Sequence, residues 1–302
     1  SEGILETESV TVLATEAIDE AYGLYNLDGS EATLHSGSYT ARGGTTARGI
    51  QNEDSSTTLK AEGVSAVGET ASSSNYGLYN DSADATLHAS SCTGHGQSSA
   101  WGIYNYNSDA TLEAEDVTAR GENRSTSNFG HGLYNDYGTA TLRGGSFTGH
   151  GGSYARGILN YGSGVTGATL EAEHVTVLAE NGTVQNYGLE NSSVATATLR
   201  GGSFTGRGNV TRGIYNNGSD ANLDAQRITA TGENGNTNHG LRIANGTAMV
   251  TQSVLEGSTH AVVRLSGVIT VSNSRLAGGT VNGSVICVAV SRGTTWSQNG
   301  CP

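Results

Sequence analysis

The chain has 302 residues, of which 45 are Gly, and a formal net charge of −13 at pH 7. No apolar run approaches the roughly 18 residues that span a membrane, and the acidity argues against nucleic acid or an anionic membrane as a partner. Apolar residues nevertheless recur at fixed places, and the only Pro is Pro302. Because Pro removes a donor from a sheet, this composition predicts an ordered, β-rich chain.

Residues 1–21 lack the full repeat that follows. Within them the segment ESVTVLATE, residues 8–16, matches the third strand of the later repeats. We expect a partial first coil that caps the structure, since the open end of a solenoid exposes unpaired strand edges.

A short repeat occupies residues 22–260. Its first phrase is Gly-Leu or Gly-Ile, usually ending in Asn, and recurs every 25 to 31 residues, with its Gly at Gly23, Gly49, Gly77, Gly102, Gly132, Gly157, Gly188, Gly213 and Gly240. A Thr-Leu phrase and then a Val/Phe-Thr-Ala/Gly phrase complete each copy. Three alternating phrases separated by turn residues predict three strands per repeat. The class predicted is all-β, a single-stranded parallel β-helix of about ten coils.

The repeat intervals alternate between short and long, so the unit is a pair of coils of 52 to 56 residues. One position at the end of the first strand is nearly always Asn, which predicts an internal amide ladder. Its members are Asn26, Asn52, Asn80, Asn105, Asn135, Asn160, Asn191 and Asn216.

Short coils carry basic residues where long coils carry acidic ones. We expect one outward column of alternating charge that fixes the register of the coils, made of His88, Glu113, Arg143, Glu171, Arg200 and Asp224. The extra residues of the long coils form loops that begin at Glu69, Glu122, Glu180 and Glu233 and end at Asn75, Asn128, Asn186 and Asn238. Ordinary turn chemistry is favoured for these loops over binding.

Two outward columns of the first strands are rich in aromatic residues and Arg. Rings with polar edges suit stacking on sugars or on a neighbouring fibre, and cross-coil stacking within the sheet is the alternative. The candidate glycan- or partner-binding stripe consists of Tyr22, Tyr25, Tyr76, Tyr79, Trp101, Tyr104, Tyr134, Tyr187 and Tyr215.

Catalytic chemistry has one candidate, Glu190, with Arg212 and Arg242 on the following coils. A single Glu cannot act as both acid and base, so no catalytic residue is expected. The sequence also lacks an HExxH motif and a His-Cys cluster, and we expect no metal and no cofactor. A single column of Thr raises ice binding as a minor alternative, against which the charged residues beside it argue; it comprises Thr33, Thr58, Thr86, Thr111, Thr141, Thr169 and Thr198.

Residues 261–302 are expected to form the terminal coils and a C-terminal cap. Cys287 and Cys301 lie close together in this segment. Such a pair predicts a disulfide that pins the last strand in an oxidising compartment, and two unrelated thiols are the alternative. Cys92 occupies a core position of the repeat, so we expect a buried thiol.

The stacked coils and the Asn ladder resemble those of right-handed parallel β-helix proteins, the architecture of the pectate lyases and of many phage tailspikes. The resemblance covers residues 1 to about 286, concerns architecture alone and implies no activity. The ending SVICVAVSRGTTWSQNGCP resembles the cysteine-pinned tails of bacterial tail-fibre-like and surface β-helix proteins.

The sequence therefore predicts a non-enzymatic protein of the cell surface or the extracellular space. The chain starts at Ser1 without Met, as expected after removal of a signal peptide. We expect a subunit of a fibre, sheath or appendage that self-associates head to tail or laterally and can bind carbohydrate. The alternative is a tailspike-like polysaccharide lyase or glycoside hydrolase.

Overall fold

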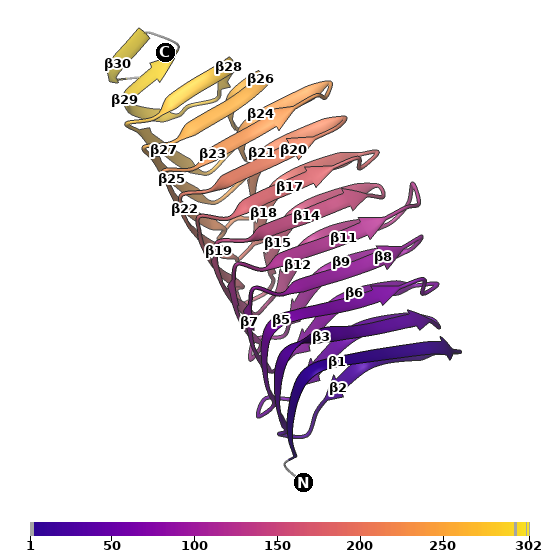
Figure 1. Ribbon diagram of the computed structural model, residues 1–302. Helices are drawn as coiled ribbons and strands as arrows, with labels where there is room; N and C mark the ends of the chain where they lie inside the picture. Colours follow the sequence, from indigo (N-terminus) through magenta and orange to yellow (C-terminus); the bar gives the residue numbers. More distant parts are fainter. Residues whose placement is uncertain (1–2, 293–294, 300, 302) are drawn as a thin grey trace.

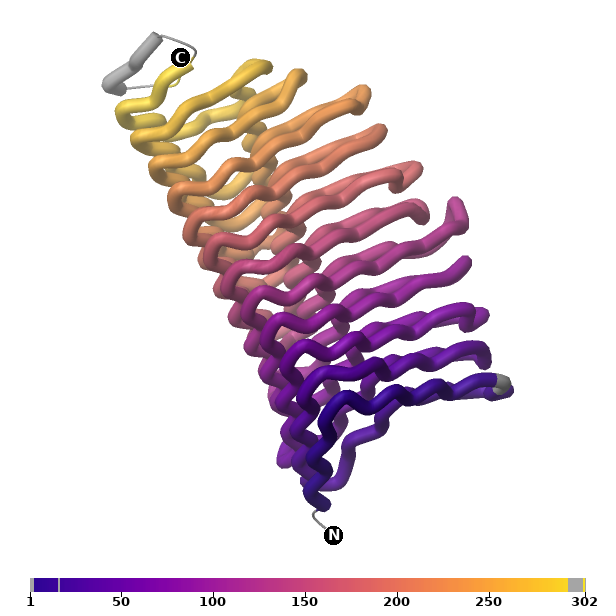
Figure 2. The backbone as a smooth tube through the Cα atoms, viewed as in Figure 1, coloured from indigo at the N-terminus to yellow at the C-terminus, as the bar shows by residue number. Residues whose placement is uncertain are grey.

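The structure, a computed structural model, describes residues 3–292, 295–299 and 301. These residues form thirty β-strands, and none of them lies in a helix. The strands follow one another around a common axis (Figure 1), and successive turns of the backbone stack in parallel (Figure 2). The fold is an all-β parallel β-helix, the class that the repeat predicts, and it has about nine turns. The right-handed sense of the coil stays a prediction.

Most turns contain three strands. The first strands, which carry the Gly-Leu/Ile phrase, are β2 (Glu20–Asn26), β4 (Thr46–Glu53), β6 (Ser74–Asp81), β9 (Ser99–Tyr106), β12 (Phe129–Asp136), β15 (Tyr154–Gly162), β18 (Gln185–Ser193), β21 (Val210–Asn217) and β24 (Thr237–Ile243). The second strands are β7 (Asp84–His88), β10 (Thr111–Glu115), β13 (Thr139–Arg143), β16 (Thr169–Glu173), β19 (Thr196–Arg200), β22 (Asn222–Gln226), β25 (Thr247–Thr251) and β27 (Val268–Ser272). The third strands are β8 (Ser91–Gly96), β11 (Thr118–Asn123), β14 (Ser146–Gly151), β17 (Thr176–Glu180), β20 (Ser203–Arg207) and β23 (Thr229–Glu233).

Longer strands run through two of these positions near the ends of the stack. They are β1 (Ile4–Ala17), β3 (Glu31–Gly43), β5 (Thr58–Glu69), β26 (Val254–Arg264) and β28 (Arg275–Asn282). Strand β1 pairs with β3 through both its second- and third-strand parts, so residues 4–17 form the partial coil expected at the N-terminus. Strand β29 (Ile286–Arg292) pairs in parallel with β27 and antiparallel with β30 (Thr295–Asn299), which ends the regular stack.

Leu and Ala alternate along the two inward columns of the second strands. Ala140 of β13 lies between Leu112 and Leu170 of the neighbouring coils, whereas Leu142, two residues later, lies between two alanines. All of these side chains are buried. Each large side chain thus meets small ones above and below it, so that adjacent coils interlock. This interlock is the physical basis of the two-coil repeat.

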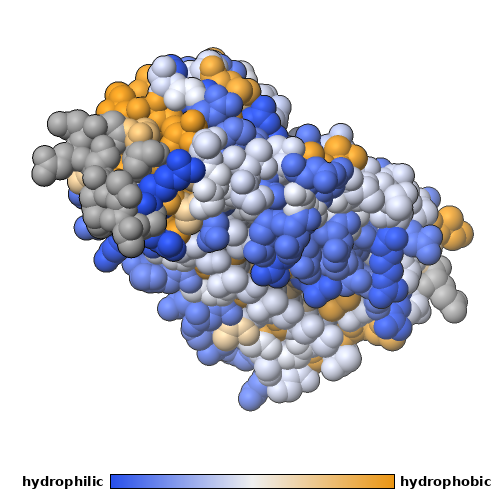
Figure 3. Space-filling model, turned by 90° about the horizontal axis from the view of Figure 1, so that it is seen from above, coloured by the Kyte–Doolittle hydropathy of each residue, from blue (hydrophilic) through white to orange (hydrophobic). Residues whose placement is uncertain are grey.

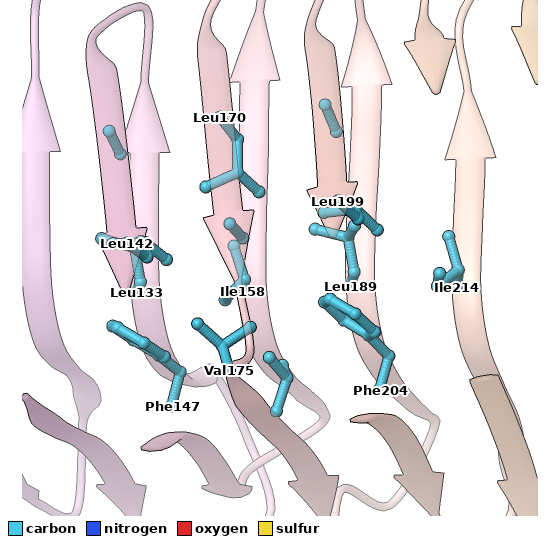
Figure 4. Packing of buried hydrophobic residues seen from close by; sticks show 14 of the residues in the cluster. Leu133, Leu142, Phe147, Ile158, Leu170, Val175, Leu189, Leu199, Phe204 and Ile214 are labelled. Atoms are coloured by element: carbon cyan, nitrogen blue, oxygen red, sulfur yellow. The ribbon is translucent and has the colours of Figure 1, made fainter. Parts of the chain in front are cut away.

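The third strands show the same complementarity. Phe147 and Phe204 of the short coils are fully buried and lie among the Leu and Ile side chains of the core (Figure 4). Each follows a Gly two residues earlier, at Gly145 and Gly202. Gly145 has a φ of 79°, and a Cβ at this position would lie 2.3 Å from the carbonyl oxygen of Val117. The turn therefore requires Gly.

The predicted amide ladder is confirmed. The Nδ2 of each Asn donates a hydrogen bond of 2.7 to 2.8 Å to the Oδ1 of the next, from Asn26 to Asn216. The same amide also donates to backbone carbonyls, as from Asn135 to Gly138 at 2.9 Å. Ile243 occupies the next position in the column and ends the ladder. The ladder satisfies polar groups inside the coil that would otherwise be buried without partners.

The expected charge column is wrong by two residues in the long coils. Glu115 of β10, not Glu113, pairs with His88 and Arg143, because the Leu-over-Ala interlock shifts the long coils relative to an alignment on Thr-Leu. Glu113 and Glu171 belong to a neighbouring column. The outward column consists of His35, Glu62, His88, Glu115, Arg143, Glu173, Arg200 and Gln226. Its charges still alternate through Arg200, and Asp224 bonds to Arg200 diagonally at 2.5 Å.

The same shift splits the expected Thr column. Thr58, Thr111 and Thr169 lie in one column, and the other four Thr lie in the next. In that second column Thr residues alternate with Lys60, Glu113, Glu171 and Asp224. A uniform Thr array, as expected for ice binding, is therefore not formed by these residues.

A second charge ladder follows the third strands and was not predicted. Its members are Arg42, Glu69, His95, Glu122, His150, Glu180, Arg207 and Glu233. The N···O distances are 2.5 Å between Arg42 and Glu69 and 3.5 Å between His95 and Glu122. Basic short coils thus lie beside acidic long coils on two faces of the stack. Each ion pair adds a small amount to the free energy of unfolding.

Loops of the long coils follow ordinary turn chemistry. Asn186 accepts a hydrogen bond of 2.7 Å from the backbone N–H of Gly182 and donates one of 2.9 Å to its carbonyl. Asn75 and Asn238 close their loops in the same way. In the remaining loop, residues 122–128, Asn123 makes these hydrogen bonds instead of Asn128.

The predicted states of the cysteines are confirmed. Cys287 and Cys301 form a disulfide with a Cα–Cα distance of 5.1 Å. Cys92 is a free thiol buried in the core, and burial raises its pKa to about 12.

Candidate functional site

The two columns of the aromatic stripe have the predicted register. Tyr76, Trp101 and His131 follow one another in one column, and Tyr79, Tyr104 and Tyr134 follow one another in the other. Each first strand contributes one residue to each column, the first just before a Gly-Leu or Gly-Ile pair and the second just after it. Both residues lie on the outer face of the strand. The Gly of this pair lies against the third strand, where a Cβ at Gly102 would meet the backbone nitrogen of Arg120 at 2.4 Å.

Most stripe rings contact a ring of a neighbouring coil, either stacked on it or edge to face. The ring centroids of Tyr76 and Trp101 are 4.7 Å apart at an interplanar angle of 8°, and those of Tyr104 and Tyr134 are 4.8 Å apart at 14°. Tyr187 is only 1% exposed, whereas Tyr25 is 43% exposed. The faces of these rings are thus largely covered by their neighbours, as the alternative of cross-coil stacking predicts. A sugar cannot stack along the whole stripe.

Arg side chains take the place of rings in several coils. The guanidinium of Arg212 lies 4.3 Å from the ring centroid of Tyr187 and 4.4 Å from that of Tyr215. Arg48 lies in the same way between Tyr22 and Tyr76. Burial lowers the pKa of Arg212, and Arg242 and Arg156 add to this effect. These cation–π contacts continue the stack at the column positions that Arg occupies instead of a ring.

Carboxylates bind the Tyr hydroxyls along the edge of the stripe. Tyr104 donates a hydrogen bond of 2.9 Å to Asp136, and Tyr25 donates one of 2.6 Å to Glu53. The hydrogen bond to Glu53 and then burial raise the pKa of Tyr25, while burial raises the pKa of Asp136. The polar ends of these rings are therefore already partnered within the chain.

The stack is interrupted where the column reads Tyr134, Leu159 and Glu190, two successive positions without a ring. Leu159 is shorter than Tyr and leaves a pocket of about 320 Å³. This volume is at the lower end of the range for small-molecule sites. The pocket is lined by Trp101, Phe129, His131, Tyr134, Arg156, Leu159, Tyr161, Glu190 and Ser192.

Aromatic and apolar groups form most of the pocket wall. Phe129, which follows the loop between β11 and β12, is 39% exposed and stacks on Tyr154 at a centroid distance of 5.7 Å. Tyr134 has Tyr104 stacked on one face, and the next residue in its column is Leu159, so no ring continues the stack on the other side. The pocket is therefore bordered by the last ring of this stack.

Polar groups gather on one side of the pocket. Arg156 donates a hydrogen bond from Nε to Oε2 of Glu190, and both side chains are almost fully buried. The partner of Glu190 is thus Arg156, on the preceding coil, whereas Arg212 and Arg242, on the following coils, lie over the ring of Tyr215. The Nη1 of Arg156 also lies 3.5 Å from Nε2 of His131. Burial, and then Arg156, holds the pKa of His131 well below its usual value, so this ring is neutral at pH 7.

Glu190 is the only carboxylate that lines the pocket. Hydrolysis of a glycosidic bond by the usual mechanism needs two. Among the described residues no group of three or more His, Cys, Asp or Glu side chains could hold a metal ion. The arrangement can bind a small molecule through aromatic surface and a paired carboxylate and guanidinium.

The sequence prediction identified part of this pocket. Trp101 and Tyr134 line it, whereas Tyr22, Tyr25, Tyr76, Tyr79, Tyr104, Tyr187 and Tyr215 do not. Arg156, Phe129 and Tyr161 were missed as site residues. The feature of the sequence that could have indicated the pocket is Leu159, which stands in a column where most coils have Tyr.

The Cys287–Cys301 disulfide is consistent with an oxidising compartment. In the part of the chain that the structure describes, no helix is long and apolar enough to span a membrane. Comparison with known proteins found no family model that matches the chain and no significantly similar curated protein.

Proposed function

We propose that this chain is a non-enzymatic structural rod of an extracellular assembly, such as a surface fibre, a sheath or an appendage. The observation that supports it best is the continuity of cross-coil bonding: the Asn ladder, two charge ladders and the aromatic stack run through most turns. Such ladders rigidify a solenoid and fix its register. The disulfide supports a location outside the cytoplasm.

Self-association is part of this proposal. At the N-terminal end Ile4 and Ile18 are 84% and 90% exposed, and β1 is paired only with β3 among the described strands. Near the C-terminal end the second-strand charge column continues through the uncharged Gln226, Thr251 and Ser272, and Figure 3 shows hydrophobic surface at this end of the stack. The exposed apolar residues of these last turns include Met249, Val268, Ile286 and Val288. Two apolar ends favour head-to-tail contact between copies.

Sedimentation over a concentration series, with electron microscopy of the same samples, tests this proposal. We expect elongated assemblies that grow with concentration, and we expect Ile4→Glu/Ile18→Glu to shift the protein to monomers. Val165→Glu is the matched control, because Val165 is also fully exposed and lies in a loop between β15 and β16. Monomers at every concentration would remove the assembly part of the proposal.

One observation keeps an enzyme as the second candidate: Glu190 lines the pocket at the break in the stack. A tailspike-like glycoside hydrolase or lyase would release reducing or unsaturated ends from a panel of polysaccharides. Release that Glu190→Gln abolishes would replace the structural proposal. We expect no release.

A further inference from the structure

We infer that the pocket at Leu159 binds a single neutral pyranose unit of a glycan. This inference narrows the carbohydrate binding expected of the whole stripe to one place. That the pocket meets an extracellular glycan rests on the proposed function. Binding of the sugar does not require the chain to assemble.

The shape of the pocket suits one sugar ring. Its volume of about 320 Å³ can hold a monosaccharide unit but not several. Tyr134 ends the ring stack on the side of Leu159, so an aromatic surface and an aliphatic floor meet there. The apolar C–H face of a pyranose packs on such a surface, with the exposed ring of Phe129 at the border.

The polar groups suit hydroxyls better than charges. Arg156 and Glu190 neutralise each other, so an ionic ligand would leave one of them without its full partner. Within the described residues Arg156 is the sole hydrogen-bond partner of the Glu190 carboxylate, through Oε2. Oε1 can accept from a sugar hydroxyl while the guanidinium donates to an adjacent one. The net charge of −13 further disfavours acidic sugars.

The composition of the pocket also separates it from the rest of the stripe. Elsewhere the column positions are filled by rings or by Arg, and several Tyr hydroxyls are bound by carboxylates, as is that of Tyr104 by Asp136. Within the described residues, Nε1 of Trp101 and Nδ1 of His131 at the pocket are buried without a partner, as are atoms of Arg212 and His239 farther along the two columns. Arg156 offsets the cost of burying Glu190, whereas burying His131 with Nδ1 unpartnered among the described residues costs free energy.

Titration calorimetry on the full chain, with the methyl glycosides of glucose, mannose and galactose and with methyl glucuronide, tests the inference. We expect at least one neutral glycoside to bind with a Kd on the order of 1 mM, typical of a weak single site, and the glucuronide not to bind. Leu159→Tyr, which restores the residue of the repeat, should abolish binding. Glu190→Gln should weaken it at least about tenfold, because a charge-assisted hydrogen bond is lost.

Gln51→Tyr is the matched control. Gln51 occupies the same column as Leu159 and is also a departure from Tyr, but it lies far from the pocket along the stack. This variant should bind the glycoside like the unmodified chain. Circular dichroism of each variant checks that the coil is retained.

Two outcomes would overturn the inference. The first is that no neutral glycoside binds, or that binding survives Leu159→Tyr. The second is that the unmodified chain binds no sugar and Leu159→Tyr disrupts assembly in the sedimentation experiment. The pocket would then be a contact between copies. Both outcomes are distinct from failure of the proposed function, since a monomeric rod can still bind the glycoside.

Discussion

His239 follows Tyr187 and Arg212 in one of the two first-strand columns and lies in a cationic environment. It is buried, and burial lowers its pKa to about 4, with Arg212, Arg242 and His260 adding to the effect. In an unfolded chain the pKa of a His is near 6.5. The folded chain therefore binds fewer protons than the unfolded chain over the interval between these two values.

This difference predicts an acid-dependent loss of stability. Above pH 6.5 His239 is neutral in both states and has no effect on the pH dependence, and between pH 6.5 and 4 the unfolded state takes up the proton first. Replacing His239 by Tyr, the residue of other coils in this column, should reduce the loss of unfolding free energy between pH 7.5 and 4.5. Urea unfolding of both proteins across this range measures it.

The measurement at pH 7.5 is the internal control, because any packing difference between His and Tyr is present there too. Subtracting it isolates the titration of His239. An unchanged difference between the two proteins from pH 7.5 to 4.5 would show that this side chain does not titrate differently on folding.

At the scale of strands, the repeat shows how far sequence reasoning reaches. The first-strand columns were predicted correctly because Gly-Leu/Ile-x-Asn has the same spacing in every coil. The second-strand columns were not, because Thr-Leu occurs at two positions that differ by two residues, as Thr86-Leu87 and Thr111-Leu112 do. Packing volume decides between these registers, since Leu must lie over Ala. The alternation of large and small residues is visible in the sequence only after the register is known.

The candidate site shows a second limit of sequence reasoning. Trp101 and Tyr134 could be placed on one surface from their repeat positions alone. That ring faces are covered, and that Leu159 leaves a hollow, depends on side chains from several coils at once. The pairing of Glu190 with Arg156 is a diagonal contact between columns, which register alone does not select.

The interlock of second strands predicts the effect of exchanging two residues within β13. The double variant Ala140→Leu/Leu142→Ala keeps composition and polarity pattern but puts Leu beside Leu112 and Leu170. Overpacking at one position and a cavity at the other should together cost about 3–6 kcal/mol of unfolding free energy. Denaturant unfolding measures this loss.

A volume-conserving variant of the same strand provides the control. Leu142→Met should cost less than about 1.5 kcal/mol, since the column keeps its large residue. Equal stability of the double variant and the unmodified chain would show that the alternation of Leu and Ala does not determine packing.

At the scale of the whole molecule, the two charge ladders and the core follow the same rule. A short coil supplies basic side chains and one arrangement of large residues, and a long coil supplies acidic side chains and the complementary arrangement. The Asn ladder differs, because both kinds of coil contribute the same residue. Coils should therefore be removable in pairs but not singly.

Two deletions test this rule directly. Removing residues 102–156 takes out one long and one short coil and leaves Leu87 beside Ala172 and His88 beside Glu173. Removing residues 102–131 takes out one long coil and puts two short coils in contact, so that Leu87 meets Leu142 and both ladders lose the Glu that lay between basic side chains. The Asn ladder is continuous in both.

We expect the smaller deletion to be the more damaging one. Overpacked Leu pairs, paired alanines and facing basic residues should make the chain without 102–131 less stable than the chain without 102–156 by about 2–5 kcal/mol. Thermal unfolding followed by circular dichroism compares the two, and the larger deletion serves as the control for loss of length. If stability simply followed the number of coils that remain, the order would be reversed, and the pair of coils would be a feature of the sequence without a role in packing.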